Sequence, residues 1–447
     1  MTARFVSLTG SRKDNMKTNL KLMTGLFALA GVVGAIGATQ AQGNVKLKLV
    51  EVITAEPRTV VLKEIIKDFE AANPGISVEL ISLPWAESYP KLTNLIQSGQ
   101  APDVAEISEN WIGLYGSLGA LENLEPYLKK FSDFKDFNKA ALSFGRSYKK
   151  TMYFMPYGFY VRGMFYNKKL FKEAKISKAP RTFDDFTSAA EKITKSGADR
   201  YGYCLRGSRG GFDSVFSYMA GYMGSADWFD KDGKSTFDSA GSIKGLELIV
   251  NLYKSGYAPK ASVNWGFNEI VSGFASGNCG MLDQDPDALL GIRDQLGAAN
   301  FDVAPMPVGP NGKAYVKYGT AGWAMFSSSK NKEAAWKLSQ FLIEKKNNLK
   351  WANFIGILPI YKGADKDAAY SDSVYKGWFA EVNNTTKYVP VQYPLYLPQL
   401  GEFFGTIAVK GIQEALLGQK TSEQVAKEWA VFLTKANQEY LKANPPK

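Results

Sequence analysis

The sequence contains no histidine and only two cysteines among its 447 residues. Without histidine, no imidazole is available as a general base, as part of a Ser-His-Asp triad or as a metal ligand. Two cysteines are too few for a structural zinc site built from thiolates. We therefore expect neither a metal site nor a bound cofactor.

Clustered positive charge is also missing. The 54 Lys and Arg outnumber the 43 Asp and Glu, giving a formal charge of +11, but no run of five basic residues occurs. A nucleic-acid-binding protein concentrates such residues in a patch or stripe, so we expect no nucleic-acid partner. The hydrophobic content of 45% and charged content of 22% are those of a soluble globular protein. The length is sufficient for two or three domains.

The apolar run near the N-terminus, residues 26–36, is shorter than the roughly 20 residues that a membrane-spanning helix needs. Lys17 and Lys21 precede this run, and Thr39-Gln-Ala41 follows it as a small-residue cleavage site. This order is typical of a secretory signal peptide. We predict that residues 1–41 are a signal peptide, with Met16 as an alternative start, and that the mature protein is periplasmic.

The first part of the mature chain has the pattern of a parallel sheet. Apolar and polar side chains alternate in residues 45–52 and 76–83, which predicts two strands. Between them, the apolar side chains of residues 61–69 recur at helical spacing, and residues 101–107 are predicted as a third strand. The carboxyl ends of parallel strands meet at one edge of the sheet, where ligands bind in open α/β sheets. The candidate residues that follow these strands are Glu56, Arg58, Trp85, Glu109, Asn110 and Trp111.

The second part of the chain repeats this arrangement. A helix ending at Gly277 leads into a buried strand, residues 279–282, which opens into a polar turn containing Asp285. Another predicted strand ends at Arg206. Aromatic, Pro- and Gly-broken segments, including residues 153–160 with Tyr157, suggest that the chain passes more than once between two lobes.

We therefore predict two α/β lobes joined by a multi-strand hinge, with a ligand cleft between them. The lobes are residues 42–156 with 308–357, and residues 157–307 with 358–447. Trp323 is a candidate for stacking on a ligand, because Gly319 and Gly322 flank it and would allow close approach. Trp265 is a further aromatic candidate.

Several sequence blocks resemble those of a known family, and they occur in the family's order. They are Pro102-Asp-Val104, residues 164–171, 180–186, 274–281 and 329–336. With the signal peptide and the βαβ start, the chain resembles extracellular solute-binding proteins of family 1, the maltose-binding-protein-like receptors of ABC importers. The resemblance implies a periplasmic-binding-protein fold and a monomer that delivers a carbohydrate or polyol to a permease.

The resemblance also implies roles for individual residues. Asn110 stands where relatives carry an acidic sugar contact, and Phe404 stands where they carry a stacking tryptophan. Asp285-Pro286 occupies the tip where relatives have a turn with a tryptophan, so Trp323 or Trp265 would replace that ring.

Such side chains suit a sugar because its C–H face packs on aromatic rings, while its hydroxyl rim pairs with carboxylates, amides and guanidinium groups. The expected stacking residues are Trp85, Trp111, Trp265, Trp323 and Phe404; the expected polar contacts are Glu56, Arg58, Glu109, Asn110, Arg206 and Asp285. For each, core packing or a solvated loop is the alternative.

Cys204 and Cys279 lie in predicted strands of the same lobe. Export would place them in an oxidising compartment, where disulfides form and persist. We predict a Cys204–Cys279 disulfide, with two buried thiols as the alternative.

We expect a binding protein without catalytic activity, and two alternatives remain open. One is a secreted glycosidase or lyase that uses paired carboxylates, since Asp and Glu are abundant. The other is a receptor for a sugar phosphate such as glycerol phosphate, because Arg58, Arg162, Arg206 and Arg209 offer guanidinium groups for bidentate pairing.

Overall fold

The computed structural model describes residues 44–445, apart from 54–55, 138 and 364–365. The predicted signal peptide lies outside these residues. Within the described part of the chain, no helix is both long and apolar enough to cross a membrane.

The larger of two sheets has seven strands. Its order is β10-β4-β9-β3-β1-β2, and β11 pairs with β9 beyond this path. The strands β1, β2 and β3 are parallel, as the sequence predicts, whereas β9 is antiparallel to both β3 and β4. The bounds are β1 Val45–Glu51, β2 Ile76–Ser82, β3 Val104–Ser108, β4 Met155–Val161, β9 Ala314–Met325, β10 Leu358–Pro359 and β11 Tyr388–Val391.

The smaller sheet has four strands in the order β6-β7-β5-β8. The pair β6 and β7 is parallel, while β5 is antiparallel to β7 and β8. The bounds are β5 Gly163–Asn167, β6 Tyr201–Tyr203, β7 Cys279–Gln284 and β8 Phe301–Ala304. The two sheets and their helices make a mixed α/β protein.

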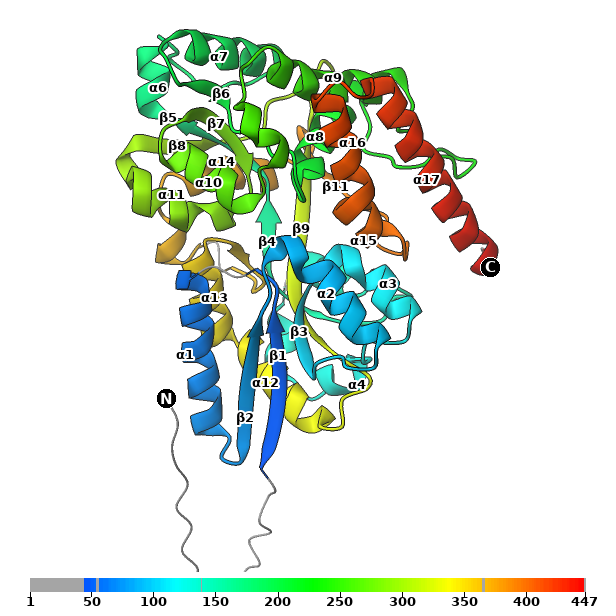
Figure 1. The fold of residues 1–447 in the computed structure, drawn as a ribbon. Coiled ribbons are helices and arrows are strands. Elements are labelled where there is room, and N and C mark those ends of the chain that lie inside the picture. The colour runs from blue at the N-terminus through cyan, green and yellow to red at the C-terminus, as the bar shows by residue number, and fades with distance from the viewer. Residues whose placement is uncertain (1–43, 54–55, 138, 364–365, 446–447) are drawn as a thin grey trace, which may run out of the picture. The chain divides into compact units, whose positions relative to one another are not determined.

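Seventeen α-helices among the described residues pack around these sheets (Figure 1). Their bounds are α1 Glu56–Ala72, α2 Trp85–Gln97, α3 Ile112–Ser117, α4 Glu125–Leu128, α5 Lys139–Gly145, α6 Lys168–Glu173, α7 Phe183–Lys195, α8 Gly211–Met223, α9 Ala240–Lys254, α10 Phe267–Ala275, α11 Leu289–Leu296, α12 Lys332–Ile343, α13 Lys345–Ile355, α14 Tyr375–Val382, α15 Leu400–Glu402, α16 Ala408–Leu416 and α17 Ser422–Ala443.

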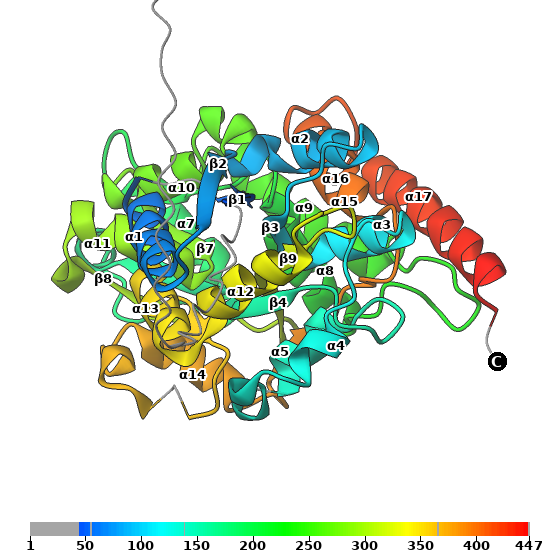
Figure 2. The ribbon, with the colours of Figure 1, turned by 90° about the horizontal axis from the view of Figure 1, so that it is seen from below.

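Two elements connect the regions built around the two sheets. The chain leaves β4 through Arg162 and enters β5 of the smaller sheet directly. The long strand β9 pairs with β11 through its first residues and with β3 and β4 through its later ones. Figure 1 shows β4 and β9 running side by side between the two sets of helices, and Figure 2 shows the same elements from below. Side chains on these strands are therefore well placed to reach a cavity bordered by both sheets.

Local sequence signals account for several helix boundaries. Thr182 accepts a hydrogen bond from the backbone of Asp185, whose carboxylate accepts from the Thr182 N–H in return. The helix α7 therefore begins with the capping box that the spacing of Thr182 and Asp185 in the sequence predicts. Thr421 and Gln424 start α17 in the same way. Each box satisfies N–H groups that the first helical turn leaves without partners.

The residue pattern also predicts a loop at residues 85–89, a helix cap at Ser242 and a chain crossing at residues 351–359, and these three local predictions were wrong. Residues 85–89, expected as a loop, form the first turns of α2, and Pro90 lies within that helix. Ser239, rather than Ser242, caps α9. Trp351, expected in a crossing segment, lies in α13. Pro90 is the sixth residue of α2 and lacks the N–H that would donate to the Ala86 carbonyl one turn earlier, so the helix gives up one backbone hydrogen bond there.

Candidate functional site

The candidate site is a cavity at the carboxyl ends of parallel strands from both sheets. Ile53, Trp85 and Glu109 follow β1, β2 and β3, whereas Arg206 follows β6 and Asp285 follows β7. The crossing strands add Tyr160 of β4 and Lys317, Thr320 and Ala321 of β9, and the remaining wall residues are Ser108, Gly210, Asp213, Phe267, Gln284 and Asp287. The cavity therefore lies at the carboxyl edge of the strands, where the sequence predicts a ligand site, and residues next to both sheets line it.

Six of the fifteen residues in the cavity wall carry a charge. Glu109, Asp213, Asp285 and Asp287 contribute carboxylates, while Arg206 and Lys317 contribute cations. The cavity has a volume of about 70 Å³. A second cavity of about 240 Å³ shares Ile53, Phe267 and Asp287 with it. That second cavity has exposed residues in its wall, so it opens to the surface beside the site.

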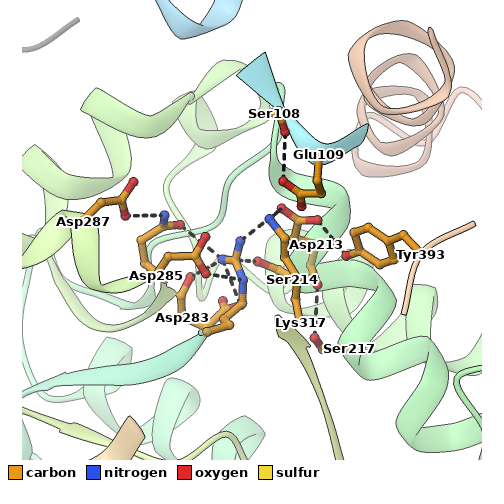
Figure 3. A network of polar contacts seen from close by, with 12 residues as sticks. Ser108, Glu109, Asp213, Ser214, Ser217, Asp283, Asp285, Asp287, Lys317 and Tyr393 are labelled. Carbon is orange, nitrogen blue, oxygen red and sulfur yellow. Dashed lines mark hydrogen bonds and ion pairs between the residues drawn. The ribbon is translucent and has the colours of Figure 1, made fainter. Parts of the chain in front are cut away.

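Arg162, between β4 and β5, is fully buried and holds three carboxylates around its guanidinium group. Its nitrogens lie 3.5 Å from Asp213, 3.6 Å from Asp283 and 3.7 Å from Asp285 (Figure 3). Its NH1 group also donates to the Asp283 carbonyl over 2.8 Å. Burial opposes the charge on Arg162, but the three aspartates together raise its pKa. Arg162 therefore orients Asp213 and Asp285 toward the cavity.

Lys317 and Asp213 form the second charged contact, with Nζ and Oδ2 3.0 Å apart. Tyr393 donates to the other Asp213 oxygen over 2.8 Å. Burial alone would raise the pKa of Asp213, but Lys317 and Arg162 outweigh it and lower that pKa. Burial raises the pKa of nearby Glu109, although Lys317 opposes the shift. The neighbouring cations therefore favour the ionised form of Asp213, whereas burial favours the protonated form of Glu109.

Asp287 and Arg206 are less completely paired. Burial, with the charge of Asp285 as a smaller contribution, raises the pKa of Asp287 to about 6. Arg206 is buried and has no ion pair among the described residues; burial and the charge of Arg162 lower its pKa to about 10. A buried cation without a partner is costly, so Arg206 is suited to polar atoms of a ligand. Asp287 is half-buried and accepts one hydrogen bond from Gln284 over 3.4 Å, so its carboxylate can accept others from a ligand.

Arg206 begins a tight loop. At Gly210 the backbone has φ of +91°, and a side chain there would strike the Arg206 guanidinium. At Gly211 a side chain would strike the Arg206 carbonyl. These two glycines let α8 begin directly behind Arg206, which brings Asp213 of the first helical turn into the cavity wall.

Trp85 lines the cavity, and Trp111 lies behind it. The two rings are stacked with centroids 5.7 Å apart. The Arg209 guanidinium lies 4.4 Å from the Trp85 ring centre and 5.3 Å from that of Trp111, and Arg209 donates to the Trp85 carbonyl. Trp111 is buried and does not line the cavity. Trp111 was expected to stack on a ligand, but in the structure it packs behind Trp85 and supports that ring.

Arg58 and Tyr157 belong to a buried network next to the site. Arg58 pairs with Glu106 and donates to the Tyr157 hydroxyl over 3.0 Å, and Tyr157 donates to Glu106. Arg58 lines the second cavity rather than the first, whereas Tyr157 is in the core. Tyr160, hydrogen-bonded to Tyr157 over 2.8 Å, reaches the first cavity instead.

The structure places Trp323, Gly322 and Phe404 in the core, away from the cavity wall. Trp323 packs on Tyr157 and Trp351, and a side chain at Gly322 would strike the Met155 carbonyl, so that glycine serves strand packing rather than ligand approach. Phe404 belongs to an aromatic cluster with Phe212, Trp228, Tyr393 and Phe403. These placements correct the three expectations.

Two further candidates, Trp265 and Asn110, also lie outside the cavity wall. Trp265 is half-buried and packs near Gly273. Asn110 has a buried side-chain oxygen without a hydrogen-bond partner, but it does not line the cavity. Glu56 begins α1, and its side chain is outside the described part of the structure. Of the predicted site residues, Trp85, Glu109, Arg206 and Asp285 line the first cavity.

Sequence reasoning missed Asp213, Asp287, Tyr160 and Lys317. Asp287 lies two residues beyond Asp285, and Asp213 lies just after the glycine-rich loop, so both were near recognised signals. Lys317 had no such signal, because it reaches the site only through the path of β9.

Cys204 and Cys279 form a disulfide with their Cα atoms 5.4 Å apart. This is the pairing that the sequence predicts. Cys279 starts β7, and Cys204 follows β6, so the bond ties together the two strands that lead to Arg206 and Asp285. Among the described residues, no group of three or more His, Cys, Asp or Glu side chains is arranged to hold a metal ion.

The structure is thus a mixed α/β protein with a cavity bordered by two sheets, an arrangement suited to holding a small solute. The chain belongs to the family of bacterial extracellular solute-binding proteins, whose sequence pattern matches residues 55–349. Members of this family are binding proteins.

The chain is similar to several other proteins. A protein of Brucella abortus that is named a putative binding protein is 29% identical over 92% of this chain and 97% of its own length. The erythritol/L-threitol-binding protein of Mycolicibacterium smegmatis is 25% identical over 85% of this chain and 80% of its own. The crystal structure of an ABC transporter solute-binding protein from Thermotoga lettingae, bound to α-D-tagatose, matches with a TM-score of 0.79 and 25% identity, covering 88% of this chain and all of that one.

Proposed function

We propose that this protein is the periplasmic solute-binding component of an ABC importer and that it captures a carbohydrate or polyol. The observation that carries the proposal is the set of carboxylates and cations that both sheets direct into one cavity. Ligand hydroxyls both donate and accept hydrogen bonds, so they satisfy both kinds of group in a desolvated site. The erythritol/L-threitol-binding relative and the tagatose-bound neighbour support this ligand class.

Delivery follows from capture in this proposal. Ligand binding favours the conformation that contacts the ligand from both sheets, and a monomer in that form is presented to the membrane permease. We propose export by the signal peptide of residues 1–41, and lobes with the boundaries predicted from the sequence. We propose no catalytic role. Incubation with a panel of glycosides should release no reducing ends, whereas turnover would support the glycosidase alternative.

A sugar phosphate is the second candidate, because Arg206 is a buried cation without an ion pair among the described residues. Its neighbours disfavour it. Four carboxylates line the same cavity, and the other lining cation, Lys317, already pairs with Asp213. A phosphate would have to enter a site with more negative than positive groups, which like-charge repulsion opposes.

The test is isothermal titration of the mature protein with erythritol, ribitol, mannitol, glucose, tagatose, maltose and glycerol phosphate. Binding of an uncharged compound, lost in Asp285→Asn and retained in Asp294→Asn, would support the proposal. Asp294 is an exposed carboxylate in the wall of the second cavity and serves as the matched control. Binding of glycerol phosphate alone would assign the site to a phosphate, and binding of none would contradict the proposed function.

A further inference from the structure

Arg209 crosses between the two regions that border the cavity. It lies in the loop between β6 and α8, next to the smaller sheet. Its NH1 group donates to the Trp85 carbonyl and reaches the Ser88 hydroxyl over 3.5 Å. Both of these residues belong to the first turn of α2, next to the larger sheet, and Trp85 precedes Arg209 by 124 residues. The contact therefore depends on how the two regions are placed relative to each other.

Three aromatic rings of the larger-sheet region surround the Arg209 guanidinium. Its central carbon lies 4.4 Å from the ring centre of Trp85, 5.3 Å from that of Trp111 and 5.8 Å from that of Tyr89. Arg209 is 7% exposed and forms no ion pair with a carboxylate among the described residues. It does not line the cavity. The guanidinium thus lies behind the cavity wall, where it contacts the opposite region but not the space for a ligand.

The loop that carries Arg209 is fixed to its own region. The Ser208 N–H donates to the Trp265 carbonyl over 3.0 Å. The same loop begins with Arg206 and leads into Asp213 of α8, and both of these side chains line the cavity. A movement that separates the two regions would therefore withdraw Arg209 from between the rings. The same movement would carry two cavity residues away from the opposite wall.

A second close contact between the two regions lies beside the first. A side chain at Gly401 would strike the Tyr89 ring, and a side chain at Gly113, in α3, would strike the Leu397 carbonyl. The segment that contains Leu397 and Gly401 leads into α16, which packs against α8. The surface formed by α2 and α3 thus faces the smaller-sheet region closely on both sides of the Tyr89 ring.

The partners of Arg209 are a carbonyl, a hydroxyl and aromatic rings, and all of them are neutral. Taking a guanidinium out of water costs free energy. The charge-assisted hydrogen bond and the attraction to the rings offset that cost. When the regions separate, water replaces these partners, and no carboxylate is left buried without its cation. A contact of this kind can form and break in every binding cycle.

From these observations we propose that Arg209 is a latch: its contact with α2 and Trp111 holds the two regions together around the ligand without touching the ligand. The proposal rests on the proposed function, because closure on a ligand is part of it. The latch stabilises the closed conformation whatever the ligand is, so its loss should weaken the binding of every ligand by the same factor. A residue that contacts the ligand would change the relative affinities instead.

Titration of Arg209→Ala with every compound of the panel above that the wild type binds tests the latch. We expect each dissociation constant to rise by about tenfold, with the ratios between compounds unchanged. Stopped-flow mixing should show a faster dissociation and a nearly unchanged association rate constant, because the ligand meets the separated form before the latch engages. Unchanged dissociation constants, tighter binding, or altered ratios would overturn the latch.

Two further variants control this experiment. Arg209→Lys keeps the charge but loses the planar group that stacks on the rings, so it should give a smaller rise; it also provides the test if the alanine variant fails to fold. Arg146→Ala removes a guanidinium that lies 5.6 Å from the Phe134 ring centre, pairs with Glu125 and is outside the cavity. It should leave the dissociation rate unchanged, and an effect equal to that of Arg209→Ala would overturn the latch.

X-ray scattering of the ligand-free proteins separates the latch from the proposed function. Loss of the latch should shift the ligand-free protein toward the separated form, which has the larger radius of gyration. If the wild type binds no compound of the panel, the proposed function is contradicted and this measurement decides the latch. A larger radius in Arg209→Ala would then support the latch, and equal radii would overturn it.

Discussion

Lys317 Nζ lies 3.0 Å from Asp213 Oδ2, although 104 residues separate the two in the sequence. Lys317 comes from the strand that pairs with both β11 and β3, and Asp213 comes from the first turn of α8. The contact therefore joins the hinge strand to a wall of the cavity. Its strength depends on ionisation, because the Asp213 pKa is lowered by Lys317 and Arg162 despite burial.

Lys317→Met should destabilise the protein by about 3–5 kcal/mol at pH 7, because it leaves Asp213 buried beside one cation fewer. A carboxyl with a depressed folded-state pKa contributes stability above its ordinary pKa and loses it as the pH falls through the folded value. The difference between variant and wild type should therefore shrink toward acid pH. Urea denaturation at several pH values measures both effects.

Lys350→Met is the matched control for this variant. Lys350 also lies 3.0 Å from its partner, Glu64, but both side chains are exposed. Its loss should cost no more than about 1 kcal/mol. Equal effects of the two substitutions would contradict a special role for the buried pair.

Glu381→Gln should stabilise the protein above neutral pH. Glu381 is fully buried on α14; one oxygen accepts from the Met306 N–H over 2.6 Å, and the other has no hydrogen-bond partner. Burial raises its pKa well above the ordinary value. Such a group contributes stability below its ordinary pKa and loses it as the pH rises through the folded value.

We expect the glutamine variant to gain about 1–3 kcal/mol over wild type at pH 8 and less at pH 5, since the amide can still accept from Met306 without carrying a buried charge. Chemical denaturation at the two pH values provides the measurement. Glu333→Gln, on the exposed face of α12, is the control and should leave the pH dependence unchanged. A glutamine variant less stable than wild type at both pH values would show that the ionised carboxylate is structurally required.

Removing the disulfide with Cys204→Ser and Cys279→Ser together should cost roughly 4–5 kcal/mol, because the bond closes a loop of 75 residues. Reduction of the wild type should lower its midpoint of thermal unfolding by a similar amount to the double substitution. Reductant should have no effect on the double variant, since the described part of the chain has no free cysteine. A reductant-sensitive midpoint in that variant would contradict this assignment.

Binding of the compound selected by titration should weaken between pH 7 and pH 5. Asp287 has a pKa of about 6, raised chiefly by burial and also by Asp285, while Gln284, Arg58 and Arg206 oppose the shift. Its carboxylate accepts hydroxyl hydrogen bonds more strongly when ionised, so protonation removes affinity. Asp287→Asn should bind more weakly at pH 7 and show a flatter pH profile. A profile as steep as that of the wild type would assign the titration to another group.

The local spacing of apolar and capping residues was sufficient to predict many of the helices and strands. The helical spacing of Ala335, Leu338 and Leu342 predicts a helix over residues 332–343, and these residues form α12 with all three side chains buried. The two capping boxes were visible for the same local reason. The start of α2 was missed, because its register depends on packing of Trp85 against Trp111 and Arg209, residues distant in the chain.

The sequence by itself determined that polar side chains follow the strands and that these ends share an edge, since the direction of parallel strands follows from the βαβ order. Four of the candidates selected in this way, Trp85, Glu109, Arg206 and Asp285, line the first cavity. Only the tertiary structure decided which aromatic rings are core and which face the cavity, because Trp323 and Trp85 have the same chemistry and differ in what packs on them. It also decided the partners of Asp213, since Arg162 and Lys317 reach it only where β4 and β9 cross between the sheets.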